Sequence, residues 1–400
     1  MAHHPTTPFT KAQLLPQEET LEIARQRGEL FIGIPREAYF QEKRICLTPD
    51  AVSAIVNNGH RVLMEKNAGL ESGFSDKEYS EAGAQITKDT RKVFGCPMIL
   101  KVEPPTLDEL ELIQPKTVII SALQLKTRKK EYFNALAKKK ITALAFEFIK
   151  DEANSFPLVR ALSEIAGTAS VLIASELMVN AEKSNGLLFG NISGVPPIEV
   201  VVIGAGTVGE FAVRSALGLG ASVKVFDSSV TKLRRIQTNV GRILHTSTLQ
   251  PKNLTKALLR CDVAIGAIRG HNRAPIVVTE GMVQRMKKGA VIIDVCVDMG
   301  GCFETTEMTS HDSPTFIKHD VIHYGVPNIP ARYPKTASLS ISNIVSPYIL
   351  EMAEHGGLEN AIRFDQGLKN GLYFYRGILT NKAVADWFDL PYSDLNLLIF

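Results

Sequence analysis

This chain of 400 residues has few cysteines, almost no tryptophan and little net charge. It has 5 cysteines, 1 tryptophan and a formal net charge of +3. The lysines and arginines are spread along the chain, so its charge gives no basis for binding nucleic acid. An odd number of scattered cysteines does not predict a disulfide framework and suits reduced, mostly buried thiols. These thiols are Cys46, Cys96, Cys261, Cys296 and Cys302. Cys296 and Cys302 stand without a CxxC motif or clustered histidines, so the sequence predicts no metal site.

Long apolar runs are also missing. No window approaches the roughly 20 continuous apolar residues that span a bilayer, and the N-terminus lacks the apolar core of a signal peptide. The content of 45% apolar and 22% charged residues is that of a soluble globular protein, and 400 residues are enough for two domains of ordinary size. We therefore expect a cytoplasmic protein of two domains that binds neither a membrane nor nucleic acid.

The most informative feature that is present is the glycine-containing stretch Val200–Gly209, which is followed by the apolar run Val223–Phe226. It has the order of strand, glycine turn, helix and strand that a dinucleotide-binding unit requires. In such a unit Gly204 permits the tight turn, and Gly206 lets backbone N–H groups approach a pyrophosphate. Gly209 then lets the helix and the strand pack closely.

Three further residues complete this predicted dinucleotide site. Thr207 and Val208 begin the helix whose N-terminus would face the phosphates. Asp227 ends the second strand, where its carboxylate can accept both hydroxyls of an adenosine ribose. Serines rather than an arginine follow it, so a 2′-phosphate would meet a carboxylate, and NAD is favoured over NADP. A glycine turn can also serve simple packing of a helix on a strand, but the flanking strands and Asp227 favour the dinucleotide interpretation.

Short apolar strands alternate with amphipathic helices from Phe31 onward. This alternation predicts an α/β fold with mainly parallel, doubly wound sheets. In the first half we expect strands at 31–34, 61–64, 98–102, 117–122 and 142–146, and helices at 50–58, 106–113 and 129–138. Beyond the dinucleotide motif we expect strands at 263–265 and 291–293, and helices at 337–355 and 383–388. The sequence therefore predicts two doubly wound domains, one of them a Rossmann domain that binds NAD.

A long helix expected at 158–180 is rich in small residues, which suit a helix that crosses between two domains. We expect the NAD-binding Rossmann domain to cover residues 158–335. The tail that follows is too short to be a domain, so we expect it to return to the first one. The substrate (catalytic) domain is then discontinuous, with residues 30–157 and 336–400, and a cleft separates the two domains. Residues 1–29 are interpreted as an N-terminal extension, in which only Gln17–Arg27 resembles a helix.

Isolated charges at predicted strand ends nominate the residues that could bind a substrate or move protons. Arg44 lies just before a predicted helix, and Lys101 closes an apolar strand. Asp294 and Asp298 flank the end of a later strand. The structural alternatives are surface ion pairs for Arg44 and Lys101 and a turn-stabilising carboxylate for Asp294. The pattern alone does not choose between these interpretations.

Motifs spread over most of the chain point to one family. They are Gly33-Ile-Pro-Arg-Glu37, Arg44 with Leu47-Thr-Pro49, Leu100-Lys-Val-Glu-Pro104, Ser163-Glu-Ile-Ala-Gly167, the glycine turn, Asp298-Met-Gly-Gly-Cys-Phe-Glu304, and Asn328-Ile-Pro-Ala331 with Pro334-Lys-Thr336. Together and in this order they resemble the alanine dehydrogenase and pyridine nucleotide transhydrogenase family. The resemblance implies the two-domain fold, NAD as the cofactor, and a homo-oligomer that is a hexamer or a dimer.

The resemblance also implies roles for individual residues. Arg44 and Lys101 would bind the carboxylate and the keto oxygen of a substrate, in keeping with the chemistry of guanidinium and ammonium groups. Asp298 would be the acidic residue at the reaction centre. Ser163 and Asn328 would contact the dinucleotide, beside the glycine turn and the ribose-binding carboxylate.

One departure from the family pattern concerns the proton-transfer group. Alanine dehydrogenases have a catalytic histidine after the strand at 117–122, where this chain has Gln124. A glutamine can hydrogen-bond a substrate oxygen, but it cannot exchange a proton near neutral pH. His271, in a loop whose sequence differs from that of the family, and His323 are candidates for the missing imidazole. A lone loop histidine is more often only solvated.

Three functions compete on this evidence. The leading expectation is NAD-dependent, alanine dehydrogenase-like oxidative deamination of L-alanine or a related small amino acid to a 2-oxo acid and ammonia. The alternative within the family is a transhydrogenase-type subunit that passes hydride to the nucleotide of another protein. The third is a catalytically diverged, NAD(H)-binding protein, because Gln124 replaces the family histidine. NADH formation from alanine, as opposed to NADH binding alone, separates the first function from the third.

Overall fold

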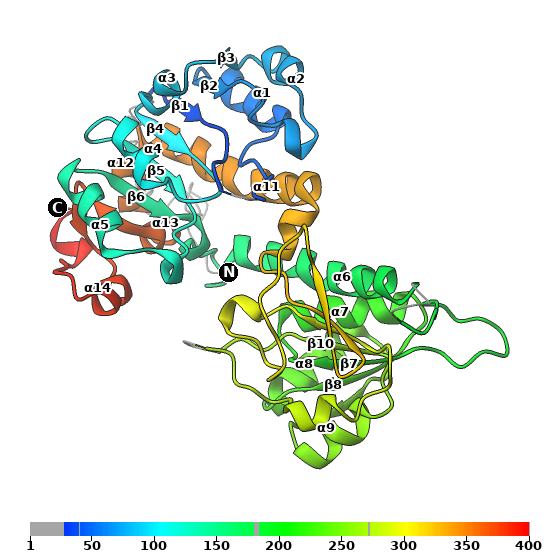
Figure 1. The fold of residues 1–400 in the computed structure, drawn as a ribbon. Helices are drawn as coiled ribbons and strands as arrows, with labels where there is room; N and C mark the ends of the chain where they lie inside the picture. The colour runs from blue at the N-terminus through cyan, green and yellow to red at the C-terminus, as the bar shows by residue number, and fades with distance from the viewer. Residues whose placement is uncertain (1–27, 40, 180–183, 271–272, 400) are drawn as a thin grey trace, which may run out of the picture.

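The computed structural model describes residues 28–39, 41–179, 184–270 and 273–399. The expected helix Gln17–Arg27 and the candidate His271 lie outside these residues. Within them the chain forms two β-sheets, each with helices on both faces, and Figure 1 shows the sheets in separate lobes. The long helices α6 (Pro157–Met178) and α11 (Pro334–Glu354) pack against each other where the lobes meet. The predicted α/β class with two mainly parallel sheets is confirmed.

The first sheet has the strand order β15-β14-β6-β5-β4-β1-β2-β3. Its strands are β1 (Phe31–Ile34), β2 (Arg61–Glu65), β3 (Gln85–Thr87), β4 (Met98–Leu100), β5 (Val118–Ser121), β6 (Thr142–Ala145), β14 (Leu372–Tyr375) and β15 (Ile378–Leu379). The strands from β1 to β6 pair in parallel, whereas β14 is antiparallel to β6 and β15. The central strands are buried on both faces, which explains their continuous apolar sequences.

Helices cover both faces of the first sheet. They are α1 (Pro49–Asn57), α2 (Asp76–Glu81), α3 (Thr90–Phe94), α4 (Leu107–Leu112), α5 (Lys130–Lys138), α11, α12 (Leu358–Phe364), α13 (Gln366–Gly371) and α14 (Lys382–Phe388). Ile119 and Ile120 of β5 belong to different hydrophobic cores, because successive side chains of a strand point to opposite faces. Helices α1 and α11 close one core through Ile55 and Ile341, and α5 closes the other through Phe133.

The second sheet has the order β12-β13-β11-β10-β7-β8-β9. Its strands are β7 (Glu199–Ile203), β8 (Ser222–Phe226), β9 (His245–Ser247), β10 (Val263–Gly266), β11 (Val291–Asp294), β12 (Thr315–Lys318) and β13 (Val321–Tyr324). Its helices are α6, α7 (Thr207–Gly218), α8 (Val230–Val240), α9 (Pro251–Leu258) and α10 (Glu280–Val283). Val201 and Val202 of β7 again enter opposite cores, one closed by α6 and α7 and the other by α9.

The C-terminal segment rejoins the first sheet after the chain has completed the second. Phe374 of β14 lies opposite Ala143 of β6 in antiparallel register. The first sheet is therefore built from two distant parts of the chain. The domain bounds 30–157, 336–400 and 158–335 stay predictions.

Helix α6 is long and apolar enough to cross a membrane, by length and composition only. The sequence predicted no apolar run that spans a bilayer, because Glu164 and Glu176 interrupt this helix. The core helices of globular proteins can have the same length and composition. Here α6 packs on α7 so closely that a Cβ atom at Gly167 would lie 2.3 Å from the carbonyl oxygen of Val208. The contacts of α6 are those of a core helix.

Candidate functional site

Polar side chains gather at one edge of the first sheet. The parallel strands β1, β4, β5 and β6 are neighbours, so their carboxyl ends lie side by side. Glu37 follows β1, Lys101 and Glu103 follow β4, Gln124 follows β5, and Glu147 follows β6. Binding sites of open α/β sheets form at this edge. We call these residues, together with Glu42 and Arg44, the charged cluster.

Arg44 is held in the charged cluster by Glu42. Its Nε and Nη2 atoms donate to the two carboxylate oxygens of Glu42 at 2.7 and 2.5 Å, and its backbone N–H donates to Oε1 at 2.9 Å. Only 4% of each residue is exposed. Burial disfavours the charge on each group, but the pair attraction outweighs it, so the pKa of Glu42 is lowered and that of Arg44 is raised. The guanidinium is therefore charged and fixed in place.

Lys101 is the second buried cation of the cluster, with 1% of its surface exposed. Its Nζ atom lies 2.7 Å from Oε1 of Glu109 and 3.7 Å from Oε2 of Glu37. Burial works to lower the pKa of Lys101, but these two carboxylates raise it above its ordinary value. Because Arg44 and Lys101 are both buried, the alternative of surface ion pairs is wrong for them.

Gln124 lies within hydrogen-bond distance of the same cluster. Its Nε2 atom donates to Oε1 of Glu103 at 2.6 Å, and that oxygen is 3.6 Å from Nη2 of Arg44. The backbone of Gln124 adopts the left-handed conformation, with a φ of 49°. Oε1 of Glu147 accepts hydrogen bonds from the backbone N–H groups of Leu123 and Gln124 at 2.7 and 3.2 Å and so holds this turn. Arg44 and Gln124 thus meet at Glu103.

Glutamates are the part of this site that the sequence reasoning missed. Burial, with the charge of Glu42, raises the pKa of Glu103 to about 8 against the opposing effect of Arg44. Burial also raises the pKa of Glu37 to about 7, although Lys101 opposes it. The signal was available, because a glutamate stands two residues from each predicted cation, at Glu42 and Glu103.

The glycine turn of the second sheet has the geometry expected for a pyrophosphate. Gly204 has a φ of 116°, and a Cβ atom there would lie 2.3 Å from the carbonyl oxygen of Ala267. A Cβ at Gly209 would lie 1.9 Å from the carbonyl oxygen of Gly204. At Gly206, the N-cap of α7, a Cβ would meet nothing within 4 Å, and no side chain caps the helix. The start of α7 thus has open space beside Gly206 and no capping side chain from that residue, which fits a bound phosphate.

Asp227 lies at the end of β8, beside this turn. Its Oδ2 accepts a hydrogen bond from the N–H of Ala205 at 2.7 Å, and its Oδ1 accepts one from the N–H of Ser229 at 2.8 Å. Thr207 and Val208 form the first positions of α7, as expected. The structure adds Arg235, whose Nη2 donates to the carbonyl oxygen of Ala205 at 3.0 Å. The turn thus has an arginine near it in space, although none follows Asp227 in sequence.

The other nominated residues lie on three different elements. Ser163 is on α6, and its hydroxyl donates to the carbonyl oxygen of Val159 at 2.6 Å. Asn328 precedes the 3₁₀ helix η6 (Ile329–Arg332) with a φ of 53°, and its Nδ2 donates to Oε2 of Glu42 at 3.3 Å. Asp298 is exposed on the 3₁₀ helix η5 (Val297–Met299), after β11. Asn328 is therefore joined to the charged cluster, although the sequence placed it with the dinucleotide.

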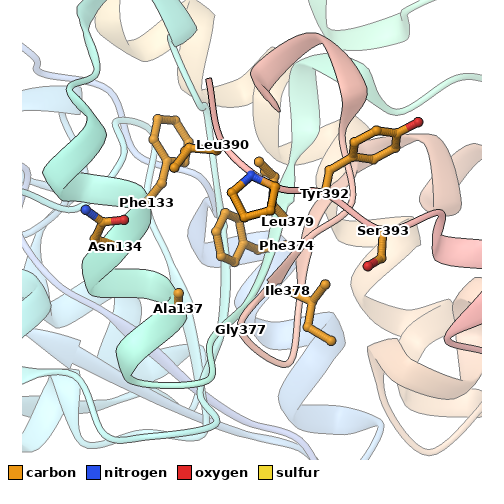
Figure 2. A pocket seen from close by; sticks show the side chains of 11 residues that line it. Phe133, Asn134, Ala137, Phe374, Gly377, Ile378, Leu379, Leu390, Tyr392 and Ser393 are labelled. Atoms are coloured by element: carbon orange, nitrogen blue, oxygen red, sulfur yellow. The ribbon is translucent and has the colours of Figure 1, made fainter. Parts of the chain in front are cut away.

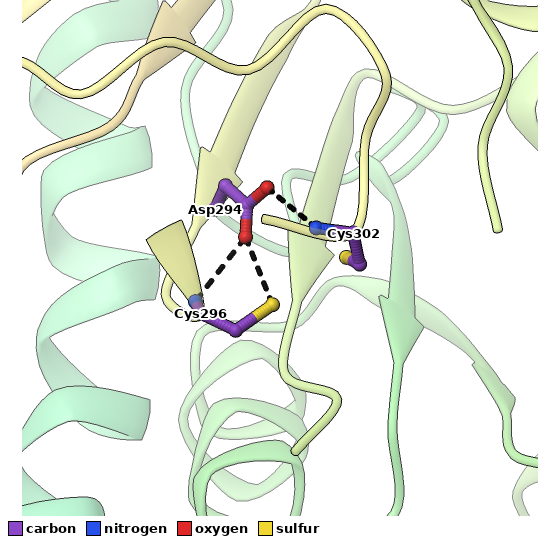
Figure 3. Close-up of side chains that lie close together, drawn as sticks. All are labelled: Asp294, Cys296 and Cys302. Carbon is purple, nitrogen blue, oxygen red and sulfur yellow. Dashed lines mark hydrogen bonds between the residues drawn. The ribbon is translucent and has the colours of Figure 1, made fainter. Parts of the chain in front are cut away.

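Asp294, Cys296 and Cys302 lie close together (Figure 3), with potential metal-binding atoms within 4.8 Å of one another. The carboxylate of Asp294 accepts hydrogen bonds from the N–H groups of Cys296 and Cys302 at 3.2 and 3.0 Å. It also accepts from the thiol of Cys296 at 3.0 Å and from the hydroxyl of Thr306 at 2.7 Å. A hydrogen bond with Cys296, together with burial, raises the pKa of the Cys302 thiol. The alternative of a turn-stabilising carboxylate fits Asp294.

His323 is the other candidate for the missing imidazole. It is 1% exposed, in the core of the second sheet, and stacks on Phe316 at 4.8 Å between ring centroids. Its Nε2 bonds to the hydroxyl of Thr305 at 2.8 Å and its Nδ1 to the carbonyl of Val321 at 3.0 Å. Burial lowers its pKa. Both ring nitrogens are engaged, which does not favour His323 as the proton-transfer group.

A pocket of about 310 Å³ lies away from these residues, between α5 and the C-terminal segment (Figure 2). Its walls include Phe133 and Ala137 of α5, Phe374 of β14, and Leu390. It is mainly apolar and contains none of the nominated site residues. We therefore do not assign the substrate or the dinucleotide to it.

Comparison with known proteins agrees with these features. The family model of the alanine dehydrogenase/PNT N-terminal domain matches residues 33–166, and that of the C-terminal domain matches residues 170–382. Alanine dehydrogenase 2 of Staphylococcus aureus (strain USA300) is 39% identical over 366 residues, 91% of this chain and 98% of that protein. A solved L-alanine dehydrogenase aligns over 90% of this chain and 99% of its own, with a TM-score of 0.85 and 35% identity. A transhydrogenase from Sinorhizobium meliloti shares the fold, with a TM-score of 0.76 and 24% identity over 88% of this chain and 99% of its own. The chain belongs to the alanine dehydrogenase/PNT family.

Proposed function

We propose that this protein is an NAD-dependent amino-acid dehydrogenase, which converts L-alanine or a related small amino acid into a 2-oxo acid and ammonia. The observation that carries the proposal is the pair of buried cations, Arg44 and Lys101, in one charged cluster at the carboxyl edge of a parallel sheet. Relatives named alanine dehydrogenase support the substrate class. The glycine turn before α7 supports the cofactor.

Each residue has a role in this proposal. Arg44 binds the substrate carboxylate through the guanidinium N–H groups that do not donate to Glu42. Lys101 stabilises charge on the oxygen at the reacting carbon. Asp298, carried from the sequence resemblance, manages protons at the reaction centre. Gly204, Gly206 and the first residues of α7 hold the pyrophosphate of NAD, which supplies the hydride acceptor when bound.

A panel of small amino acids assayed for NADH formation tests the proposal. We expect the absorbance of NADH to rise when alanine or another small amino acid is mixed with the protein and NAD in a buffer without ammonia. The reverse assay, with 2-oxo acid, ammonia and NADH, must then consume NADH with the same side-chain preference. Failure with every amino acid, in a protein that still binds NADH, would overturn the proposal.

We expect the protein to prefer NADH over NADPH. The carboxylate of Asp227 is fixed by Ala205 and Ser229, and it would repel a 2′-phosphate on the adenosine ribose. Fluorescence titration of both nucleotides measures the preference. Asp227→Asn should narrow the difference in affinity between NADH and NADPH. Arg235→Gln is the control, because Arg235 lies beside the same turn. Equal or tighter binding of NADPH by the unmodified protein would contradict the role of Asp227.

A second candidate function is a catalytically diverged NAD(H)-binding or transhydrogenase-like protein. It is favoured by Gln124, which offers no titratable proton at the histidine position. It is also favoured by the carboxylates of Glu42 and Glu109, which already pair with Arg44 and Lys101.

Gln124→His distinguishes the two candidates. An imidazole with a pKa near ~6.5 would stand against the substrate oxygen, so NADH formation from alanine should rise by about an order of magnitude or more. The gain should carry a new pH dependence near neutrality, measured as kcat across pH. Gln124→Asn, which keeps an amide, is the matched control and should bring no gain. A Gln124→His variant that binds NADH normally but stays inert would favour the binding function.

A cytoplasmic location and a homo-oligomer, either hexamer or dimer, complete the proposal. They rest on the composition of the chain and on the family resemblance.

A further inference from the structure

We propose that Glu103 is the acid–base residue of this site and exchanges protons with the substrate in place of the histidine that Gln124 replaces. The inference rests on the proposed dehydrogenase function and adds a residue to it. It starts from the position of Glu103, two residues after Lys101 and at the end of a central strand.

Glu103 lies between Arg44 and Gln124, two of the residues that would contact the substrate. Its Oε1 accepts the hydrogen bond of the Gln124 amide at 2.6 Å and is 3.6 Å from Nη2 of Arg44. Only 4% of the residue is exposed. A general base must reach its proton directly or through one water, and a substrate carboxylate held on Arg44 would bring the reacting carbon toward this carboxylate. Gln124, which cannot titrate, donates its amide to Glu103 and leaves the proton exchange to that carboxylate.

The other carboxylates of the cluster are committed to different tasks. Glu37 accepts hydrogen bonds from the backbone N–H groups of Val102 and Glu103 at 2.7 and 3.3 Å. Glu147 likewise holds the backbone of the turn at Gln124. Loss of either charge would weaken a backbone anchor.

Glu42 is held in its ionised form by Arg44, and Glu109 is paired with Lys101 at 2.7 Å. In contrast, within the described part of the chain the Glu103 carboxylate contacts the side chains of Gln124 and Arg44, so its proton can move without loss of a backbone anchor. The charged groups that face it are Glu42 and Glu37, which favour its protonated form, and Arg44, which favours the carboxylate. This balance suits a group that must both take and give a proton.

From the iminium onward the proton steps balance with Glu103 as the exchanging group, whereas Asp298 acts before hydride transfer, on the proton of the substrate ammonium. After hydride has left the substrate carbon, a water adds to the iminium carbon and gives one proton to the carboxylate of Glu103. The carboxyl returns this proton to the amine of the carbinolamine, which makes it a leaving group. Glu103 then takes the proton of the hydroxyl as the C–N bond breaks and ammonia departs, and it releases that proton to solvent. The net change is iminium and water to 2-oxo acid, ammonia and one proton.

The first test compares kcat across pH for the unmodified protein and Glu103→Gln, with Glu111→Gln on the exposed side of α4 as the matched control. Glu103→Gln should lower kcat by ~10²–10⁴-fold and abolish the pH-dependent limb near neutrality, while NADH binding is unchanged. Glu103→Asp, which keeps a shorter carboxylate, should retain that limb at a lower rate. The double variant Glu103→Gln with Gln124→His should recover turnover, because the imidazole replaces the lost acid–base group.

The second test follows the melting temperature of the same variants across pH, and it needs no substrate. A carboxyl with a raised pKa stabilises the fold below its unfolded pKa, and this stability is lost as pH rises through the folded value. The pKa of Glu103 is raised to about 8, so the Tm of the unmodified protein should fall more steeply between mildly acidic and mildly alkaline pH than that of Glu103→Gln.

The outcomes separate this inference from the proposed function. Turnover by the unmodified protein together with an unaltered kcat profile in Glu103→Gln overturns the role of Glu103 and leaves the dehydrogenase function in place. Absence of turnover with every amino acid overturns both, whatever the Tm shows. If Glu103→Gln does not fold, Glu103→Asp decides: a lowered kcat with a shifted limb supports the role, and an unchanged profile overturns it.

Discussion

Asp298→Asn is expected to lower kcat by ~10²–10⁴-fold while NADH binding is unchanged. The amide keeps the shape of the side chain and loses its proton chemistry and charge. Asp298 is exposed on η5, at the carboxyl edge of the second sheet, where a nicotinamide bound at the glycine turn of the same sheet would lie. The measurement is kcat for alanine beside a fluorescence titration with NADH.

The loop that carries Asp298 is built to hold one conformation. Gly300 and Gly301 follow with φ angles of 92° and 71°, and Asp294 anchors both ends of the loop through the N–H groups of Cys296 and Cys302. A conservative change at Asp298 should therefore leave the fold intact. Asp312→Asn, another exposed aspartate, is the control and should keep full turnover. Unchanged kcat in Asp298→Asn would return Asp298 to a purely structural role.

The sequence predicted helices and strands well where apolar residues recur at a regular spacing. The expected strand at 31–34 coincides with β1, and the expected helix at 129–138 differs from α5 (Lys130–Lys138) by one residue. The strands β14 and β15 were missed, as were α12 and α13. Those elements are short, and what defines them is pairing with β6 and packing on a core formed much earlier in the chain. Such long-range contacts leave no periodic signal in a local window.

The candidate site was predictable in its backbone elements and less so in its charges. Gly204 and Gly209 have the geometric reasons that the motif implies, because a Cβ atom at either position would collide with a backbone carbonyl. Arg44 and Lys101 were nominated, but the contacts of Arg44 with Glu103 and of Lys101 with Glu37 depend on the loops after β1 and β4 meeting at one sheet edge. The link between Asn328 and Glu42 spans 286 positions in the sequence, which no motif spacing can show. The burial of His323, one of the two histidine candidates, is visible only once the sheet is formed.

Glu42→Gln is expected to be the most destabilising single change in the charged cluster. It would leave the guanidinium of Arg44 buried with only the more distant Glu103, at 3.6 Å, as an acidic partner. Breaking a buried ion pair by removing one partner costs about 3–5 kcal/mol, and the residual contact with Glu103 places the expected loss at the lower end of that range. The free energy of unfolding from urea titration measures it.

The pH dependence of that loss identifies its cause. Burial raises the pKa of Glu42, but the charge and hydrogen bonds of Arg44 lower it by more. The folded pKa therefore lies below the ordinary value of 4.5. A carboxylate with a lowered pKa contributes stability that is present above the unfolded pKa and is lost as pH falls through the folded one. The difference between the unmodified protein and Glu42→Gln should therefore be full at neutral pH and shrink below pH 4.5.

An exposed ion pair supplies the control that makes this prediction sharp. Arg61 Nε and Glu29 Oε1 are 2.6 Å apart, as close as the buried pair, but 55% of each side chain is exposed. Pairs in water contribute only about 0–1 kcal/mol, because solvent screens them, so Glu29→Gln should change stability little at any pH. The double variant Glu42→Gln with Arg44→Met removes both buried charges and should be more stable than Glu42→Gln alone. Equal losses for Glu42→Gln and Glu29→Gln would mean that Arg44 is not confined as the contacts indicate, and that solvent reaches it when Glu42 is gone.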